Sequence, residues 1–135
     1  MIETGSLPQY GNSVHRINVN IDSPISGFEL HLMETGSGAG VFKTANLVTF
    51  SGKEGYLFDQ SGNFFGGYRS GSPFELSVYY DHSNRTFSYY HENTFIANKL
   101  DVTGASVLDT GNVNFVMFNK HGNSSVSVLS SGTIS

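Results

Sequence analysis

Two neighbouring stretches of the chain, residues 74–81 and 86–90, alternate apolar side chains with tyrosine, hydroxyl and carboxylate side chains. Sugars present C–H faces that stack on aromatic rings, and hydroxyls that hydrogen-bond to carboxylate and hydroxyl groups. The polar set therefore favours the binding of a glycan, with Tyr79 and Tyr90 as a stacking platform. The alternative is that these tyrosines pack under a loop or against another subunit, with their hydroxyl groups reaching water. The other residues of the predicted platform are Glu75, Ser77 and Asp81 in the first stretch and Ser88 in the second.

The turns beside these stretches carry further polar side chains. Loops on a rigid scaffold often hold recognition residues, and Arg85 in the first turn is included among the predicted ligand-binding residues. The same residue types are also ordinary solvated turn formers, so both interpretations stay open for the others. These are His82, Asn84, His91, Glu92 and Asn93.

Catalysis needs groups that the sequence does not bring together. Glycosidases use two carboxylates about 5–10 Å apart. Glu75 and Asp81 are six residues apart on one expected strand, which separates them by roughly 20 Å. A partner carboxylate from another strand stays open, with Glu29, Glu54 and Asp59 as candidates, and no G-x-S-x-G segment is present. We therefore predict that the protein is not an enzyme.

The composition also gives no support for a metal or cofactor site. The chain has no cysteine, which excludes thiolate ligands, disulfides and a cysteine nucleophile. Its five histidines are separated in the sequence, without the H-x-H or H-E-x-x-H spacing of zinc sites. We expect neither a metal nor a cofactor.

The charge of the chain limits its partners. The formal net charge is −4, and the seven lysines and arginines are scattered over 135 residues. Nucleic acids and anionic membranes require clustered basic side chains. No apolar run reaches the length of about 18 residues that a membrane span needs. We therefore predict no nucleic-acid binding and no membrane insertion.

Residues 1–13 are polar and contain Pro8 and Gly11, which indicates a linker or lead-in segment. They have neither a basic start nor an apolar stretch, so we do not expect a signal peptide. A protein that works outside a cell would then be a fragment of a longer chain, or would leave the cell by lysis or another route. Residues 14–135 are predicted to form a single domain.

The elements that must position the platform are β-strands. Apolar residues recur at every second position along most of the chain, between clusters of turn residues. This pattern gives some nine or ten short strands and predicts an all-β fold, an antiparallel β-sandwich of the jelly-roll type. Residues 41–43 and 47–50 are expected to be two strands around the turn Thr44-Ala45-Asn46.

The strand phase decides which of the four tyrosines between residues 79 and 90 face the solvent. Successive side chains of a strand point to opposite faces, so the apolar sets must share a core. We expect Tyr80 and Tyr89 inside, and Tyr79 and Tyr90 outside. The inward set is completed by Phe74, Leu76, Val78 and Phe87.

Two other predicted strands have less regular patterns. Residues 113–118, VNFVMF, are nearly apolar on both faces, as in a central strand or a subunit interface. Residues 64–68, FFGGY, place glycines beside aromatic rings. Such glycines mark a β-bulge or the close approach of a ligand or backbone, and we favour the bulge.

From residue 50 to about 129, the order of elements resembles a concanavalin-like or laminin-G-like jelly roll. The matching segments are GYLFDQSGNFFGGY, FELSVYYD, NRTFSYYHENTFIAN and VNFVMFNKHGNSSVSVL. The chain departs from this pattern in having Glu92-Asn93-Thr94 at a hairpin where members often have Asn-Gly or Asp-Gly, and in having no tryptophan. No run of carboxylates resembles the family's calcium loop, so no metal site is carried over.

The resemblance implies carbohydrate recognition or host attachment, including in phage tail proteins. We therefore predict a non-catalytic carbohydrate-recognition or host-attachment domain of a virion protein, in a phage tail or fibre, with a cell-surface glycan as its partner. It would be located in the virion or outside the cell, as a homotrimer or attached to a larger tail assembly. The alternative is a structural, trimeric oligomerisation module of a viral fibre without its own ligand, in which residues 113–118 pair between chains.

Overall fold

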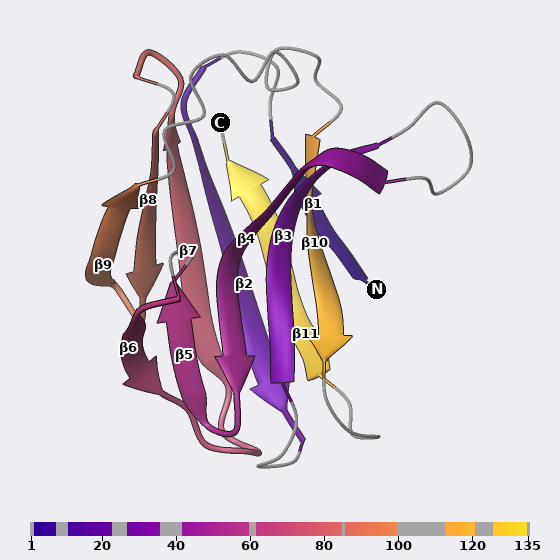
Figure 1. The fold of residues 1–135 in the computed structure, drawn as a ribbon, viewed down its shortest axis with the longest axis vertical. Helices are drawn as coiled ribbons and strands as arrows, with labels where there is room; N and C mark the ends of the chain where they lie inside the picture. The colour runs from indigo at the N-terminus through magenta and orange to yellow at the C-terminus, as the bar shows by residue number, and fades with distance from the viewer. Residues whose placement is uncertain are drawn as a thin grey trace.

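A computed structural model of the chain describes residues 2–7, 11–22, 27–35, 42–59, 62–84, 86–99, 113–120 and 126–134. These residues form two antiparallel sheets that stack face to face (Figure 1). The six-stranded sheet contains, in order, β1 (Ile2–Ser6), β10 (Val113–Lys120), β3 (Gly27–Thr35), β4 (Phe42–Lys53), β5 (Tyr56–Asp59) and β6 (Phe64–Gly67). The five-stranded sheet contains β11 (Val126–Ile134), β2 (Ser13–Ile21), β7 (Phe74–Asp81), β8 (Thr86–His91) and β9 (Thr94–Lys99).

The predicted all-β sandwich is confirmed, with eleven strands among the described residues where nine or ten were expected for the chain. Every pairing between neighbouring strands is antiparallel in the part of the chain that is described. Within the same ranges, no helix has the length and hydropathy needed to cross a membrane.

The core lies between the two sheets and follows the alternation of the strands. In β2, the burial alternates from residue to residue, with Ile17, Val19 and Ile21 at most 1% exposed. In β7 and β8, the predicted inward side chains are all buried, so the predicted strand phase is confirmed. They are Phe74, Leu76, Val78, Tyr80, Phe87 and Tyr89.

Residues 42–53 form one continuous strand, β4, and the prediction of two strands around a turn at Thr44-Ala45-Asn46 is wrong. The register against β3 shifts between Leu32 and Glu34, where β4 advances from Leu47 to Lys43. The extra residues of β4 are therefore absorbed within the ladder, as in a β-bulge, and the chain continues without reversing. The local sequence does not reveal this bulge, because a shift in register is defined only by the pairing of β4 with β3.

Part of the segment predicted as a linker belongs to the sandwich. β1 pairs with the outer edge of β10, and Thr4 and Leu7 are buried. This strand was not predicted, because its polar sequence, Glu-Thr-Gly-Ser, shows no apolar alternation. An edge strand needs only one neighbour, and its backbone hydrogen bonds form whatever its side chains are.

The apolar strand β10 is central, as one of its two interpretations predicted. It pairs with β1 on one side and with β3 on the other, and Val113–Met117 is buried throughout. Both edges of β10 are paired with strands of the same chain. The prediction that residues 113–118 pair between chains is therefore wrong. Its composition reflects burial on two faces.

The predicted bulge near the glycines of β6 is confirmed. The register between β5 and β6 shifts between Leu57 and Phe58.

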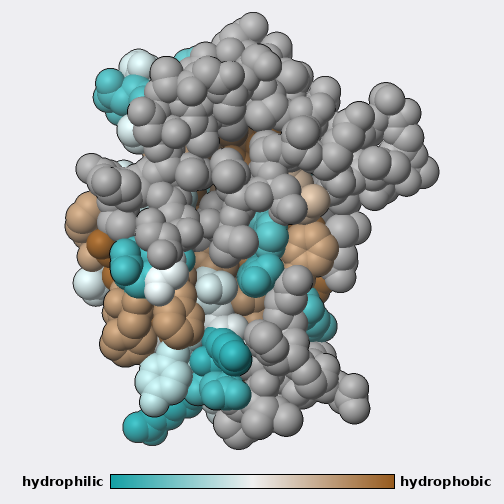
Figure 2. Space-filling model, viewed as in Figure 1, coloured by the Kyte–Doolittle hydropathy of each residue, from teal (hydrophilic) through white to brown (hydrophobic). Residues whose placement is uncertain are grey.

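Three aromatic side chains of β5 and β6 lie together. Tyr56 and Phe64 are 55% and 61% exposed, with their ring centroids 5.7 Å apart, and the ring centroids of Phe58 and Phe64 are 6.4 Å apart. We call these three residues the β5–β6 aromatic cluster. Figure 2 shows apolar side chains gathered over β5 and β6 on this side of the molecule.

One glycine of β4 makes a sharp packing prediction. A Cβ at Gly52 would overlap the ring of Phe28 and lie 3.0 Å from the ring of Tyr68. Phe28 is fully buried, so its ring has little room to move. We expect Gly52→Ala to lower the free energy of unfolding by about 1–3 kcal/mol, measured by urea denaturation.

The matched control for Gly52→Ala is Gly132→Ala in β11, where an added Cβ meets nothing within 4 Å. This control is expected to change stability by less than about 0.5 kcal/mol. Equal stability of the two variants would contradict the close packing of Phe28 on Gly52.

Candidate functional site

Tyr79 and Tyr90 lie together on the outer face of the five-stranded sheet, as predicted. Tyr79 pairs with Ser88 and Ser77 pairs with Tyr90 across β7 and β8. The centroids of the two tyrosine rings are 4.7 Å apart, with a 45° angle between the ring planes. Both side chains are half-buried. The two rings pack against each other, and part of each ring remains accessible to solvent.

Phe95 on β9 extends this pair, and the sequence analysis did not assign it to the site. It is opposite Tyr90 in the ladder, its ring lies 5.6 Å from that of Tyr90, and it is 52% exposed. Tyr79, Tyr90 and Phe95 thus cross three neighbouring strands, and we call them the aromatic row. The apolar alternation of residues 95–98 indicates a strand there. Whether Phe95 shares a face with Tyr90 depends on the register of the hairpin between β8 and β9.

Arg16 on β2 ends the aromatic row on the other side. Its Nη2 donates a hydrogen bond to the Tyr79 hydroxyl at 3.3 Å, and its side chain is exposed. Arg16 is not among the residues predicted for the site, because its proximity to Tyr79 depends on the pairing of β2 with β7. The arginine predicted for this site, Arg85, lies outside the described residues.

A polar hollow of about 230 Å³ lies beside Arg16 on the same face. Asn18 Nδ2 donates to Ser130 Oγ at 2.7 Å, which joins β2 to β11 across the hollow. The predicted residue Glu75 also lines it, so guanidinium, amide, carboxylate and hydroxyl groups meet there. The lining of this polar hollow consists of Arg16, Asn18, Glu75, Ser130, Ser131, Gly132 and Ile134.

Two residues of the predicted platform have other places in the structure. Ser77 is only 2% exposed, and its Oγ donates to Glu75 Oε1 at 3.5 Å. Asp81 accepts hydrogen bonds from Asn84 N and Nδ2 at 3.3 and 2.8 Å, which caps the turn after β7. Ser77 is therefore not an open contact residue, and the Asp81 carboxylate is engaged by the turn. Ser88 is half-buried beside Tyr79 in the ladder.

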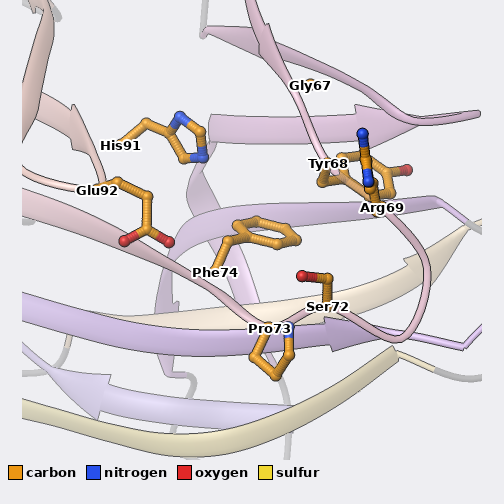
Figure 3. A pocket seen from close by; sticks show the side chains of 8 residues that line it. All are labelled: Gly67, Tyr68, Arg69, Ser72, Pro73, Phe74, His91 and Glu92. Carbon is orange, nitrogen blue, oxygen red and sulfur yellow. The ribbon is translucent and has the colours of Figure 1, made fainter.

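A second, larger pocket lies at the start of β7, with a volume of about 430 Å³ (Figure 3). In Figure 3, His91 and Glu92 form one side, Tyr68 and Arg69 the other, and the Phe74 ring lies between them. His91 and Glu92 were predicted to lie in a turn, but their proximity to residues 67–74 was not predicted. We call this the end pocket, and its lining residues are Gly67, Tyr68, Arg69, Ser72, Pro73, Phe74, His91 and Glu92.

The hairpin between β8 and β9 holds Glu92 in a left-handed conformation. Glu92 and Asn93 have φ angles of 50° and 68°, in a turn that usually favours glycine or asparagine. Glu92 N donates to Glu75 O at 3.0 Å, and Glu92 Oε1 accepts from Glu75 N at 2.8 Å. These two bonds offset the strain of the turn and fix the carboxylate at the pocket wall.

Burial lowers the pKa of His91, and the nearby Glu92 carboxylate only partly opposes this effect. At neutral pH the ring is therefore the uncharged imidazole, which offers one donor and one acceptor. In the residues that the structure describes, no three histidine or acidic side chains are grouped to hold a metal ion.

No protein-family model matches the chain, and no curated protein matches it in sequence. Solved structures do share its fold. The chain resembles galectin LEC-6 of Caenorhabditis elegans with a TM-score of 0.57 and 13% identity, over 99% of this chain and 89% of that chain. It resembles an alginate lyase from Corynebacterium sp. with a TM-score of 0.60 and 10% identity, over 96% of this chain and 60% of the lyase.

A second lyase, alginate lyase AlgAT5 of polysaccharide lyase family 7, gives a TM-score of 0.58 at 8% identity, over 92% of this chain and 59% of the lyase. The chain thus spans less than two thirds of the length of the lyases. At these identities the likenesses establish the fold alone, which is a jelly-roll β-sandwich. The same fold occurs in lectins and in polysaccharide-cleaving enzymes.

Proposed function

We propose that the protein is a non-catalytic carbohydrate-recognition domain, and that the outer face of its five-stranded sheet binds the glycan. The observation that carries this proposal is the aromatic row beside the polar hollow. Tyr79 connects the two, because its ring contacts Tyr90 and its hydroxyl accepts a hydrogen bond from Arg16.

The chemistry of this face suits an oligosaccharide. Rings on three neighbouring strands form an elongated apolar surface on which successive sugar C–H faces can stack. Arg16 and Asn18 supply hydrogen-bond donors and Glu75 supplies acceptors at the end of that surface. The glycan would therefore lie across the strands, with its apolar faces on the row and its hydroxyls in the hollow.

The fold likeness supports the same function. Galectins use a jelly roll of this kind to bind carbohydrates, and the chain spans nearly the whole of one galectin. We propose a cell-surface glycan as the partner and a virion attachment protein, such as a phage tail or fibre, as the biological setting. In that setting the domain would act outside the cell, as a homotrimer or as part of a larger tail assembly.

The absence of catalysis is part of the proposal, because lyases share the fold. Alginate belongs among the polysaccharides tested, since two of the similar structures are alginate lyases. Incubation with alginate and with host polysaccharides is expected to release no reducing ends or unsaturated ends. Time-dependent release that scales with protein concentration would overturn the non-catalytic assignment.

The role of Arg16 gives a direct test of binding. Arg16→Ala removes the charged donor at the junction of the aromatic row and the polar hollow, and its exposed side chain is not needed for the core. Affinity for the best saccharide from a polysaccharide panel, measured by calorimetry, is expected to fall about 5- to 15-fold.

The matched control is Lys53→Ala, which removes another exposed cation, from the other sheet. This variant is expected to bind as the wild type does. Equal losses in the two variants would mean that general charge, and not the Arg16 site, determines affinity. An unaltered affinity in Arg16→Ala would remove Arg16 from the site.

A further inference from the structure

We infer that the end pocket is a second, separate saccharide site, which takes a single neutral pyranose ring. The floor of the pocket is aromatic. Phe74 and Tyr68 stack with centroids 5.3 Å apart and a 25° interplanar angle, and His91 meets Phe74 edge-on at 5.9 Å. Phe74 is only 5% exposed and backs the half-buried Tyr68, so the open part of the Tyr68 ring is the surface available to the C–H face of one sugar ring.

The walls supply hydrogen-bonding groups of every kind. Arg69 offers only donors and the Glu92 carboxylate only acceptors, whereas neutral His91 and the Ser72 hydroxyl offer both. A sugar hydroxyl is itself a donor and an acceptor. Adjacent hydroxyls on one ring match this mixture better than a ligand with a single kind of polar group.

The charge of the pocket selects a neutral ligand. Arg69 contributes one positive charge and Glu92 one negative charge, on opposite sides of Phe74 (Figure 3). An acidic sugar would be attracted by Arg69 but repelled by Glu92. An amino sugar would be attracted by Glu92 but repelled by Arg69. Since His91 is uncharged at neutral pH, the two formal charges balance and favour neither sign of ligand.

The pocket is also preformed. Gly71 N donates to Ile21 O at 2.8 Å and Ser72 N donates to Arg69 O at 3.1 Å, which fixes the loop that carries Arg69 and Ser72. The opposite wall is fixed by the two bonds between Glu92 and Glu75. A site whose walls are already ordered loses little conformational entropy when it binds.

The end pocket is distinct from the aromatic row. The main chain of Glu75 is bonded to Glu92 at the pocket wall, while its side chain lines the polar hollow on the outer face. The two sites therefore lie on different sides of the first residues of β7, and the two hollows share no lining residue among those described. Occupancy of one does not require the other, and this inference stands or falls independently of the proposed function.

The test is a titration of the ¹⁵N-labelled protein with neutral methyl hexosides, and in parallel with glucuronic acid and N-acetylneuraminic acid, followed by amide chemical shifts. We expect saturable shifts of Gly67, Ser72 and His91 with a neutral hexoside, and about tenfold weaker binding of the acidic sugars. Acidic sugars that bind these residues as tightly as the best neutral one would overturn the inference, as would the absence of shifts there with every neutral hexoside.

Three variants separate the end pocket from the outer face. His91→Phe keeps a ring against Phe65 and Phe74 but removes both nitrogens, and Arg69→Ala removes an exposed side chain that the core does not need. Each is expected to weaken hexoside binding at the pocket by about tenfold. Arg16→Ala is the matched control and should leave it unchanged. Wild-type hexoside affinity in both His91→Phe and Arg69→Ala would refute the site.

Discussion

A protein in which Tyr79 and Tyr90 are both replaced by alanine is expected to lose glycan affinity by about 30- to 160-fold. Each stacked ring contributes roughly 1–1.5 kcal/mol beyond simple burial, and two such contributions multiply to this range. The fold should survive, because both side chains lie on the outer face and are only half-buried. Calorimetric titration with the best-bound saccharide measures the loss, and circular dichroism verifies the fold.

The β5–β6 aromatic cluster supplies the matched control. Tyr56 and Phe64 are as exposed as any aromatic residues described, and they contact each other on the opposite sheet. The double variant Tyr56→Ala/Phe64→Ala removes the same number of rings from the other face and should bind as the wild type does. A loss of affinity in this control, with none in the Tyr79/Tyr90 variant, would place the glycan on the six-stranded sheet.

The second large effect concerns His15, a buried residue that connects the ends of the chain. Its Nε2 lies 2.8 Å from Thr4 Oγ1 on β1, and its Nδ1 lies 2.7 Å from Thr133 Oγ1 on β11. Its ring stacks on Phe115 with a centroid distance of 4.1 Å and an 8° angle. The Thr4 hydroxyl donates to Phe115 O, so it accepts from Nε2–H, and Nδ1 accepts from Thr133.

Burial lowers the pKa of His15 from 6.5 to about 4, and a backbone hydrogen bond with Gly132 opposes this only in part. The folded state therefore holds His15 neutral, while the unfolded chain takes up a proton below about pH 6.5. The stabilisation is complete above that pH and is lost as the pH falls towards 4. Its full extent is roughly 3 kcal/mol.

Urea denaturation at about pH 7.5 and about pH 4.5 is expected to show a loss of roughly 2.5 kcal/mol of stability attributable to His15. His91, whose pKa is also lowered, changes stability in the same direction. The comparison that isolates His15 is therefore with His15→Gln, which keeps a polar side chain but cannot titrate. This variant should be less stable at neutral pH and lose less on acidification. An identical pH dependence in wild type and variant would contradict the neutral buried state.

The strand phase of the site could be predicted from the sequence because it is a local property. Alternation within β7 and β8 was enough to separate Tyr79 and Tyr90 from Tyr80 and Tyr89, whose buried rings now lie in the core. The partners of the tyrosines were not predictable in the same way. Arg16 is 63 residues from Tyr79 in sequence, and only the pairing of β2 with β7 brings them together.

The same distinction explains the other differences. Ser77 alternates outward, yet it is flanked in register by Arg16 and Tyr90 on the neighbouring strands, and its side chain is buried. The end pocket combines the segment after β6 with the hairpin after β8, two segments that only the stacking of the sheets brings together. β1 was missed because its stability comes from pairing with β10, a strand more than 100 residues away.

The most direct test of the account is a chemical-shift map of the bound saccharide that the polysaccharide panel identifies as tightest. We expect the largest amide shifts on β2, β7, β8 and β9, around Arg16, Tyr79, Tyr90 and Phe95. We also expect intermolecular nuclear Overhauser contacts between sugar protons and the tyrosine rings. Shifts confined to β5 and β6 around Tyr56 and Phe64, with the tyrosines of β7 and β8 unperturbed, would contradict it.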